Sequence, residues 1–323
     1  LLPVRSIAAD GTVVLAQRHR YGLGPHARLK VFNLVEEIDQ PGEYALEPSR
    51  QRLLVLLPPG AQGLSLSWTG VPLLQIGNEA SHIRFEGIGF DETRGPGIVA
   101  TGEHLEFDHC SLARIGGTAL AAAGRNIMIR DCRFSCLGAG GIVLGGGDRP
   151  TLARADNVVD HCAIEDFSRL VRTYAPAVSV EGVGNTVSHC LLAGAPHSAI
   201  LFGGNEHRIC DNEIHSVLSE TGDCGAIYGG RDWTTFGTLI SGNWIHDLGG
   251  VPGRWACGIY LDDQLSGIAV RGNWVDHAEL GSMVGGGRYD LVEENIFSHG
   301  KNAISMDARG LGWARKNQGT MLE

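Results

Sequence analysis

The stretch His109-Cys110-Ser111-Leu112 decides the fold, because the chain repeats its pattern along most of its length. Every copy has Cys or Asn at the second position and an apolar residue at the fourth. The copies are roughly 20 to 30 residues apart, and such intervals are typical of stacked structural repeats. The second positions of the copies are Cys110, Cys132, Cys162, Cys190, Asn212, Asn243, Asn273 and Asn295.

Each repeat consists of short runs with the composition of β-strands. Ile127-Met128-Ile129 and Ile142-Val143-Leu144 are rich in β-branched residues, and Gly, Asn and Asp bound them. No helical spacing of apolar residues is sustained along the chain. The sequence therefore predicts an all-β chain that folds as a right-handed parallel β-helix of about nine or ten coils. In such a solenoid, equivalent residues of successive coils form ladders.

The repeated Cys and Asn are expected to form one of these ladders. The amide of an Asn can bond to the next coil, and a Cys at the same place is a small buried filler. A line of cysteines differs from the close pairs that bind zinc, so no metal site is predicted. A disulfide between Cys224 and Cys257, at nearly matching points of neighbouring coils, is left open. A second polar ladder is predicted from His215, His246, His277 and His299.

The repeat defines the domain organisation. Residues 1–63 lack it and are expected to cap the open first coil, while residues 64–323 are predicted to form the β-helix. A solenoid lengthens without dividing its core, so one elongated domain is predicted. Since the chain ends soon after Asp307, further coils are expected to be absent from it.

Charge and hydropathy exclude two classes of partner. The formal net charge is −10, which argues against a nucleic-acid partner. No apolar run reaches the length of about 18 residues that a membrane span needs. The chain opens Leu1-Leu2-Pro3-Val4, without the basic start and apolar region of a signal peptide.

Carboxylates replace glycines at one corner of a few repeats. Ile227-Tyr228 runs into Gly229-Gly230, whereas in the next repeat Ile259-Tyr260-Leu261 runs into Asp262-Asp263. Because side chains alternate along a strand, Tyr260 and Asp262 are expected on one outward face, with Tyr228 stacked beside Tyr260. Other carboxylates at this corner are Glu181 and Asp307.

Insertions occur in the same repeats, at residues 168–176, 217–224 and 249–257. Aligned insertions form a rim of loops on one side of a solenoid, where solenoids usually bind their ligands. The sequence therefore predicts a groove between these loops and the carboxylate corner. The residues predicted to bind a substrate there are Tyr228, Tyr260, Arg231, Trp233, Trp255, His197, Glu220, Glu181 and Asp307.

The predicted catalytic residues are Asp223, Asp263 and Asp262. Asp223 precedes the Tyr228 strand, and the other two follow the equivalent strand of the next coil, so both arms are expected to converge over the tyrosines. Flat aromatic rings beside carboxylates suit a sugar polymer. A carboxylate pair supplies an acid together with a nucleophile or base.

Three segments resemble signatures of bacterial β-helix carbohydrate-active enzymes: 222–234 (GDCGAIYGGRDWT), 258–263 (GIYLDD) and 307–310 (DARG). Residues 33–44 (NLVEEIDQPGEY) are similar to the N-terminal segment of these enzymes. The group that the chain resembles is glycoside hydrolase family 141, whose described activities include α-L-fucosidase and xylanase. The resemblance implies a catalytic pair of Asp223 with either Asp263 or Asp262, and a secreted or periplasmic protein.

The main hypothesis is a glycoside hydrolase that needs no cofactor and cleaves a polysaccharide or oligosaccharide. Carboxyl groups about 5 to 5.5 Å apart favour retention of configuration, and neighbouring coils are compatible with that spacing. One alternative is a lyase or epimerase acting on uronic acids. In that case Arg231, Arg254, Arg288 or a Ca²⁺ held by the carboxylates would neutralise the substrate. Another alternative is a non-catalytic carbohydrate-binding protein.

Overall fold

The computed structural model describes residues 2–19, 22, 31–251 and 253–320, which form two units, Leu1–Leu66 and Ser67–Glu323. The first unit contains two antiparallel hairpins, β1 (Val4–Ile7) with β2 (Val13–Leu15) and β3 (Tyr44–Glu47) with β4 (Arg52–Val55). Its short 3-10 helices are η1 (Val35–Glu37) and η2 (Pro48–Arg50). That this unit caps the first coil stays a prediction.

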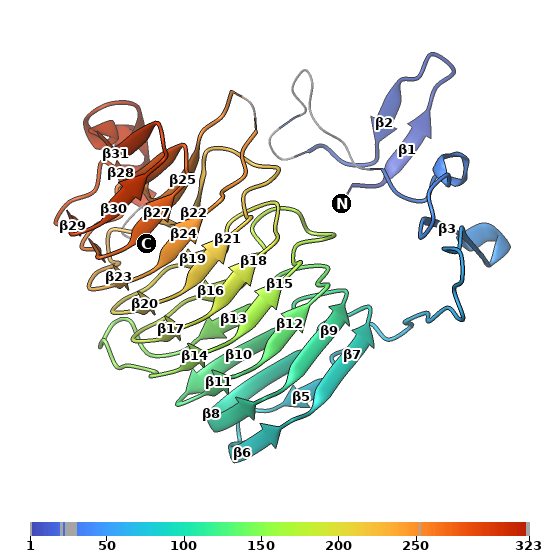
Figure 1. The fold of residues 1–323 in the computed structure, drawn as a ribbon, viewed down its shortest axis with the longest axis horizontal. Helices are drawn as coiled ribbons and strands as arrows, with labels where there is room; N and C mark the ends of the chain where they lie inside the picture. The colour runs from blue at the N-terminus through green and yellow to red at the C-terminus, as the bar shows by residue number, and fades with distance from the viewer. Residues whose placement is uncertain (1, 20–21, 23–30, 252, 321–323) are drawn as a thin grey trace. The chain divides into compact units, whose positions relative to one another are not determined.

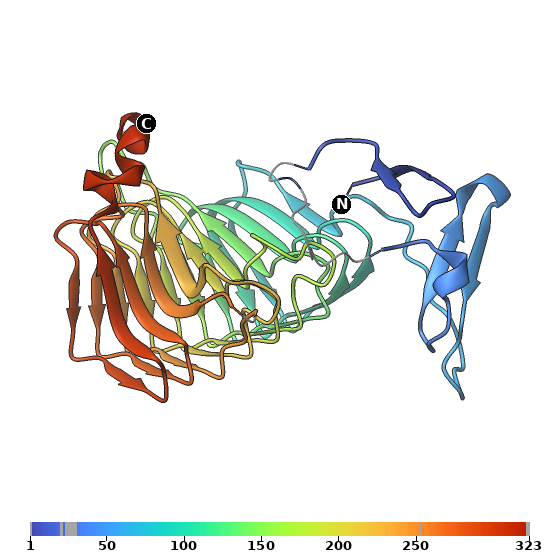
Figure 2. The same cartoon turned by 90° about the horizontal axis from the view of Figure 1, so that it is seen from above.

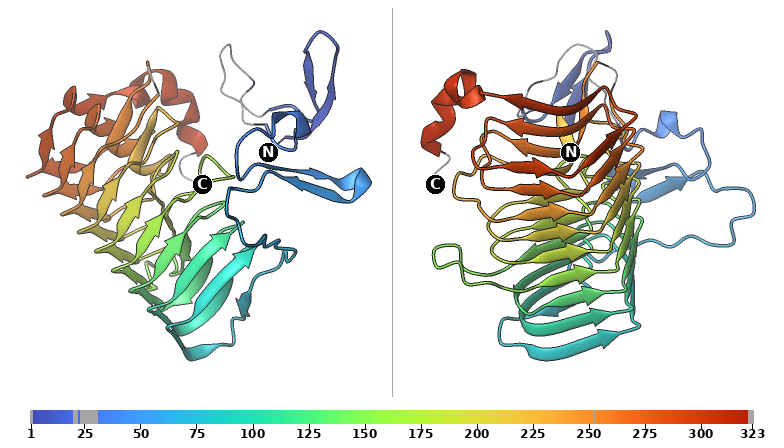
Figure 3. Two further views of the ribbon diagram at one scale, coloured as in Figure 1. Left: turned by 45° about the vertical axis from the view of Figure 1, so that its right-hand side comes forward. Right: turned by 60° about the vertical axis from the view of Figure 1, so that its left-hand side comes forward.

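The second unit is a right-handed parallel β-helix, which confirms the predicted fold. Every strand pair in it is parallel, and the pairing joins each coil to the next one along the chain. We name its three columns of strands face A, face B and face C, in the order in which the chain visits them. Figure 1 shows the face C strands side by side from β7 to β30, and Figures 2 and 3 show the stacked coils from other directions.

The strands of each face follow one another at the interval of the sequence repeat. Face A contains β5 (Leu74–Ile76), the first half of β8 (Ile98–Asp108), β10 (Leu120–Arg125), β13 (Ile142–Gly145), β16 (Val178–Val180), β19 (Ile200–Phe202), β22 (Cys224–Gly230), β25 (Ala256–Asp262), β28 (Leu280–Gly285) and β31 (Asn302–Asp307). Face B contains β6 (Ser81–Glu86), the second half of β8, β11 (Met128–Arg130), β14 (Val158–Asp160), β17 (Thr186–Ser188), β20 (Arg208–Cys210), β23 (Leu239–Ser241), β26 (Ala269–Arg271) and β29 (Leu291–Glu293). Face C contains β7 (Gly89–Thr93), β9 (Ser111–Ile115), β12 (Arg133–Ser135), β15 (Ala163–Glu165), β18 (Leu191–Ala193), β21 (Glu213–His215), β24 (Trp244–His246), β27 (Trp274–Asp276) and β30 (Ile296–Ser298).

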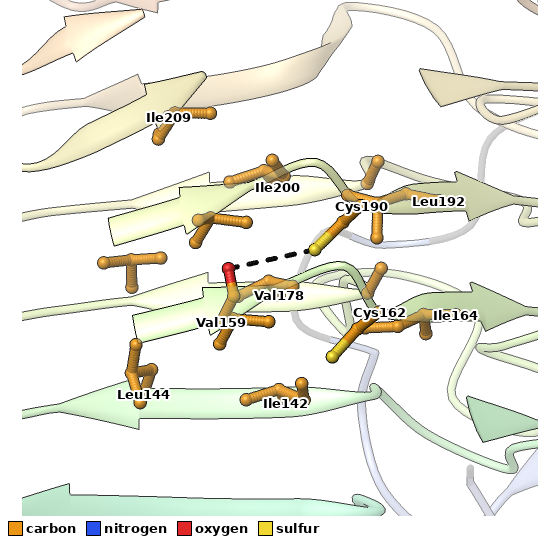
Figure 4. Close-up of a cluster of buried hydrophobic side chains, with 14 of the residues drawn as sticks. Ile142, Leu144, Val159, Cys162, Ile164, Val178, Cys190, Leu192, Ile200 and Ile209 are labelled. Carbon is orange, nitrogen blue, oxygen red and sulfur yellow. Dashed lines mark hydrogen bonds between the residues drawn. The ribbon is translucent and has the colours of Figure 1, made fainter. Parts of the chain in front are cut away.

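Aliphatic ladders fill the interior of the β-helix. On face A, Ile142 lies opposite Val178, which lies opposite Ile200 on the following coil, and all three are buried. Figure 4 shows these side chains pointing into the coil together with Ile164 and Leu192 of face C. Burial of apolar surface stabilises a fold by about 25 cal/mol for each Å², so a continuous ladder of this kind supplies the main stabilisation of the stack.

The Cys and Asn of the repeat form the predicted ladder at the corner between face B and face C. The backbone N–H of Cys190 donates to Asn212 Oδ1 at 3.0 Å on the next coil. The amide of Asn212 donates to Asn243 Oδ1 at 2.9 Å, and that of Asn243 donates to Asn273 Oδ1 at 2.8 Å. The four cysteines of the ladder are buried free thiols. The ladder therefore supplies hydrogen bonds between coils where the chain turns and its backbone lacks strand partners.

We expect Asn243→Ala to lower the free energy of unfolding by about 2 to 4 kcal/mol, because it leaves several buried polar groups unpaired. Asn243 is fully buried, and its amide also donates to the Ile209 carbonyl at 3.0 Å. Chemical denaturation followed by circular dichroism measures the change. Asn302→Ala is the matched control, because Asn302 is exposed on β31. Equal losses in the two variants would contradict a stabilising role for the ladder.

Helices are few and short in the part of the chain that the structure describes. After β31 the chain forms η3 (Arg309–Leu311) and η4 (Trp313–Thr320), which Figure 2 shows beside the last coils. None of the described helices is both long enough and apolar enough to cross a bilayer.

Candidate active site

The site lies on the outer side of face A, where β22, β25 and β31 end. The predicted register is confirmed: Tyr228 lies opposite Tyr260, and Gly230 lies opposite Asp262. The two tyrosine rings meet edge to face, with centroids 5.4 Å apart. The long strands β22 and β25 hold these residues in a regular parallel pair, so the backbone fixes the spacing between the tyrosines and the carboxylates.

The guanidinium of Arg309 lies at the centre of the carboxylates. It is only 8% exposed and donates from Nη1 to Asp262 Oδ1 and to Asp263 Oδ1, the latter at 3.0 Å. Its Nε and Nη2 donate to the two oxygens of Asp307 at 2.9 and 2.8 Å. The hydrogen bonds from Arg309 hold the pKa of Asp307 below its ordinary value. One cation from the end of the β-helix therefore ties together carboxylates of two different coils.

A glycine on the intervening coil makes room for this contact. Gly285 lies opposite Asp307, and a Cβ at Gly285 would lie 2.7 Å from Arg309 Cζ. Any side chain at this position would push the guanidinium away from the Asp262 coil. No role is predicted for Arg309 from the sequence. The sequence feature that could have indicated a role is that Arg309 is the arginine of the segment 307–310, one of the segments that carry the family resemblance.

Asp262 and Asp263 differ in access to solvent. Asp262 Oδ2 accepts from the Tyr228 hydroxyl at 2.7 Å, and its Oδ1 accepts from the Asp263 backbone N–H at 2.8 Å. Asp263 Oδ2 accepts from Arg231 Nε at 2.5 Å, and Arg309 binds its other oxygen. The side chain of Asp262 is 10% exposed and that of Asp263 is 2% exposed. Asp262 is therefore the more accessible of the two carboxylates.

Asp223 faces the same carboxylates from the loop before β22. The residue is exposed at the rim and has a left-handed backbone conformation, with φ 56°. Desolvation of its carboxyl group by the surrounding loops raises its pKa, and the negative charge of Asp262 raises it further. The positive charges of Arg309 and Arg254 act in the opposite direction. The site thus contains a carboxyl group that is more easily protonated than usual beside an arginine-bound carboxylate.

The predicted rim of loops exists. The connections from face C to face A at residues 166–177, 216–223 and 247–255 are longer than the corresponding connection at 194–199. An ion pair joins the first two loops, with Arg172 Nε donating to Glu220 Oε2 at 3.0 Å. A backbone hydrogen bond of 2.8 Å from Asp223 to Trp255 joins the last two. Glu220 therefore helps to hold the loops together.

Tyr260 does not offer its ring to a ligand, contrary to the expectation from the sequence. It is 2% exposed and packs in an apolar cluster with Cys257, Leu280 and Met283. Trp255 and Tyr228 lie over this cluster and are partly exposed. The sequence does not predict the burial of Tyr260, because the long loop that covers it is an insertion and the repeat does not fix where an insertion packs.

Other predicted residues lie next to β16, β19 and β22 on face A. His197 is buried, its ring is 4.9 Å from that of Tyr174, and burial lowers its pKa to about 4, so its imidazole is neutral near pH 7. The carboxyl group of Glu181 lies against Gly203, because a Cβ at Gly203 would be only 2.7 Å from Glu181 Oε2. Desolvation raises the pKa of this carboxyl group. Trp233 follows β22 in the connection at residues 231–238. Their contact with a substrate stays a prediction.

Cys224 and Cys257 do not form the disulfide that the sequence left open. Cys224 lies opposite Ala256, and Cys257 lies opposite Gly225, so the two are out of register by one residue. Both are buried free thiols. Because side chains alternate between the two faces of a strand, a shift of one residue directs the thiols to different sides.

The carboxylates of the site do not form a metal cluster in the described part of the chain. Three groups of side chains there have the geometry to hold a metal ion, and none of them includes a carboxylate of this site. The guanidinium of Arg309 already lies where a cation would bridge Asp262, Asp263 and Asp307. This arrangement gives no support to a Ca²⁺ site among these three residues.

Comparison with known proteins supports the fold. No model of a protein family matches the sequence, and no curated protein matches it. Among solved structures, a glycoside hydrolase is similar with a TM-score of 0.65 and 16% identity, over 90% of this chain and 60% of that one. The pectate lyase Pel9A is similar with a TM-score of 0.55 and 14% identity, over 77% of this chain and 68% of that one. The chain thus spans 60% of the length of the first of these proteins and shares the parallel β-helix fold with both.

Proposed function

We propose that the protein is a glycoside hydrolase that cleaves a polysaccharide or oligosaccharide with Asp223 and Asp262. The observation that carries the proposal is the exposed position of Asp223 at the rim, where the negative charge of the arginine-bound Asp262 on the next coil helps to raise its pKa. Glycosidic cleavage needs this combination of one protonated and one ionised carboxyl group. The fold shared with a glycoside hydrolase is compatible with it.

In the proposed mechanism, Asp223 protonates the oxygen of the leaving group. Asp262 either attacks the anomeric carbon or activates water, and its hydrogen bonds from Tyr228 and Arg309 orient its carboxylate. Asp263 is buried beneath and supports Arg231 and Arg309. We retain the expectation of a retaining reaction, which NMR of the first anomeric product tests. The likeness to family 141 and a secreted or periplasmic location are parts of the same proposal.

We expect Arg254→Ala to shift the basic limb of the pH profile of kcat/KM to higher pH. Removing this cation raises the pKa of Asp223, because Arg254 stabilises its ionised form. The acid then stays protonated to higher pH, and activity persists there. Arg271→Ala is the matched control, since Arg271 pairs with Glu293 on face B. A basic limb that moves to lower pH, or equally in both variants, would contradict Asp223 as the acid.

One specific observation favours the lyase or epimerase alternative. The side chain of Arg231 is 70% exposed although its Nε donates to Asp263, so its remaining N–H groups face solvent, where a uronate could bind. The proposal is tested by screening the protein against aryl glycosides, neutral polysaccharides and polyuronates. New reducing ends without ultraviolet absorbance support hydrolysis. An absorbing unsaturated product would establish a lyase instead, and binding without any turnover would establish a non-catalytic carbohydrate-binding protein.

A further inference from the structure

A second group of reactive side chains lies away from the proposed active site, at the turn between face B and face C. The carboxylate of Asp160 binds two imidazoles, with His161 Nδ1 at 2.7 Å from Oδ2 and His189 Nδ1 at 2.8 Å from Oδ1. The two rings come from adjacent coils and stack with centroids 4.6 Å apart. The Ser188 hydroxyl donates to Asp160 Oδ1 at 2.7 Å and orients the carboxylate.

The same unit occurs a second time, at the turn between face C and face A. His277 and His299 approach the two oxygens of Asp276 with their Nδ1 atoms at 2.9 and 2.6 Å. Their rings stack with centroids 4.6 Å apart, and the Ser298 hydroxyl donates to Asp276 Oδ1 at 2.6 Å. His277 and His299 are the last two members of the polar ladder that the sequence predicts. The structure adds the carboxylate that joins each pair.

The backbone explains why the two units match. His161, His189, His277 and His299 all have left-handed backbone conformations, with φ between 49° and 52°. Each histidine directly follows the last residue of a strand. That last residue is Asp on one coil and Ser on the next coil, and the strand register places the Asp opposite the Ser. The fold therefore holds two imidazoles and one carboxylate in a fixed arrangement before any ligand binds, which lowers the entropic cost of binding.

We propose that Asp160, His161 and His189 bind a divalent transition-metal ion such as Zn²⁺, and that Asp276, His277 and His299 form a second site of the same kind. In each group the ligand atoms all lie within 4.8 Å of one another. Two imidazole nitrogens and a carboxylate oxygen are a donor set that suits zinc, with water completing the tetrahedron. Each serine acts as the outer hydrogen bond that orients the carboxylate ligand. Binding would crosslink adjacent coils.

The third group with metal-binding geometry shows what disqualifies a site. It contains Asp108, His109 and Asp131, but Arg84 and Arg130 both donate to Asp108 Oδ2. Guanidinium groups thus already neutralise this carboxylate. In contrast, no arginine contact is described for the carboxylates of Asp160 and Asp276 in the residues that the structure covers. The proposal is therefore limited to these two groups.

The test is titration of the full chain, free of any affinity tag and stripped of metal, with Zn²⁺ by calorimetry and with Co²⁺ by visible absorption. We expect two ions per chain. His189→Ala and His299→Ala should each remove one ion, and the double variant should remove both, with circular dichroism confirming the fold. Zn²⁺ should also raise the melting temperature of the wild type more than that of the double variant.

The matched control is His104→Ala. His82 and His104 stack on adjacent coils with centroids 4.6 Å apart and also have left-handed backbones, but no carboxylate hydrogen bond is described for them within the covered residues. This variant should still bind two ions. Absence of Zn²⁺ binding by the wild type, retention of both ions in the double variant, or a thiolate charge-transfer band with Co²⁺ would each overturn the proposal.

Discussion

Asp223→Asn is expected to lower turnover of a natural glycoside by about 10²- to 10⁴-fold, the usual contribution of a general acid. The melting temperature should stay close to that of the wild type, because Asp223 is exposed and no hydrogen bond of its side chain supports the described fold. The loss should be much smaller for an aryl glycoside whose leaving group needs no protonation. Steady-state kinetics on both substrates measure the difference.

Asp262→Asn should instead lower turnover on both substrates. A good aryl leaving group removes the need for an acid, but the reaction still needs a nucleophile or base. This variant should also be less stable, because it removes one partner of a buried pair with Arg309. Asp247→Asn is the control for the loop. Asp247 is exposed in the neighbouring loop, with φ 50° close to that of Asp223. Equal losses in Asp223→Asn for the two substrates would remove Asp223 from the role of acid.

Gly285→Ala is the second change with a large expected effect. The added Cβ would lie 2.7 Å from Arg309 Cζ, so the guanidinium must withdraw from Asp262 and Asp263. We expect a loss of about 1 to 3 kcal/mol in the free energy of unfolding, as for other overpacked positions. Turnover should fall with it, because Asp262 loses a hydrogen bond that orients it. Denaturation and kinetics on the same preparation measure both effects.

Gly145→Ala is the matched control, because Gly145 also ends a face A strand and a Cβ there meets nothing within 4 Å. Its stability should change by no more than about 0.5 kcal/mol. Arg309→Lys provides an independent check. A lysine keeps the charge but lacks the planar fork that reaches three carboxylates at once, so turnover should fall here too. If Gly285→Ala behaves like Gly145→Ala, the guanidinium has no role in orienting Asp262.

The sequence was sufficient for the fold and for the register between neighbouring coils. From Cys110 to Asn295, the Cys or Asn of the repeat recurs once in each coil. Because equivalent residues of successive coils lie one strand spacing apart, a count of residues was enough to predict the ladder. The same count placed Tyr228 beside Tyr260 and Asp262 beside Gly230. Contacts between neighbouring coils are predictable because parallel pairing converts sequence register directly into distance.

Tertiary structure alone decided which side chains act together across longer gaps. Arg309 reaches past a whole coil through the space that Gly285 leaves, and no register relates an arginine in a terminal helix to Asp262. The burial of Tyr260 depends on a loop outside the repeat. The greater solvent access of Asp262 than of Asp263, on which the proposed choice between these adjacent carboxylates rests, was also not visible in the sequence. A repeat determines where backbones lie, whereas side-chain reach and loop cover depend on packing in three dimensions.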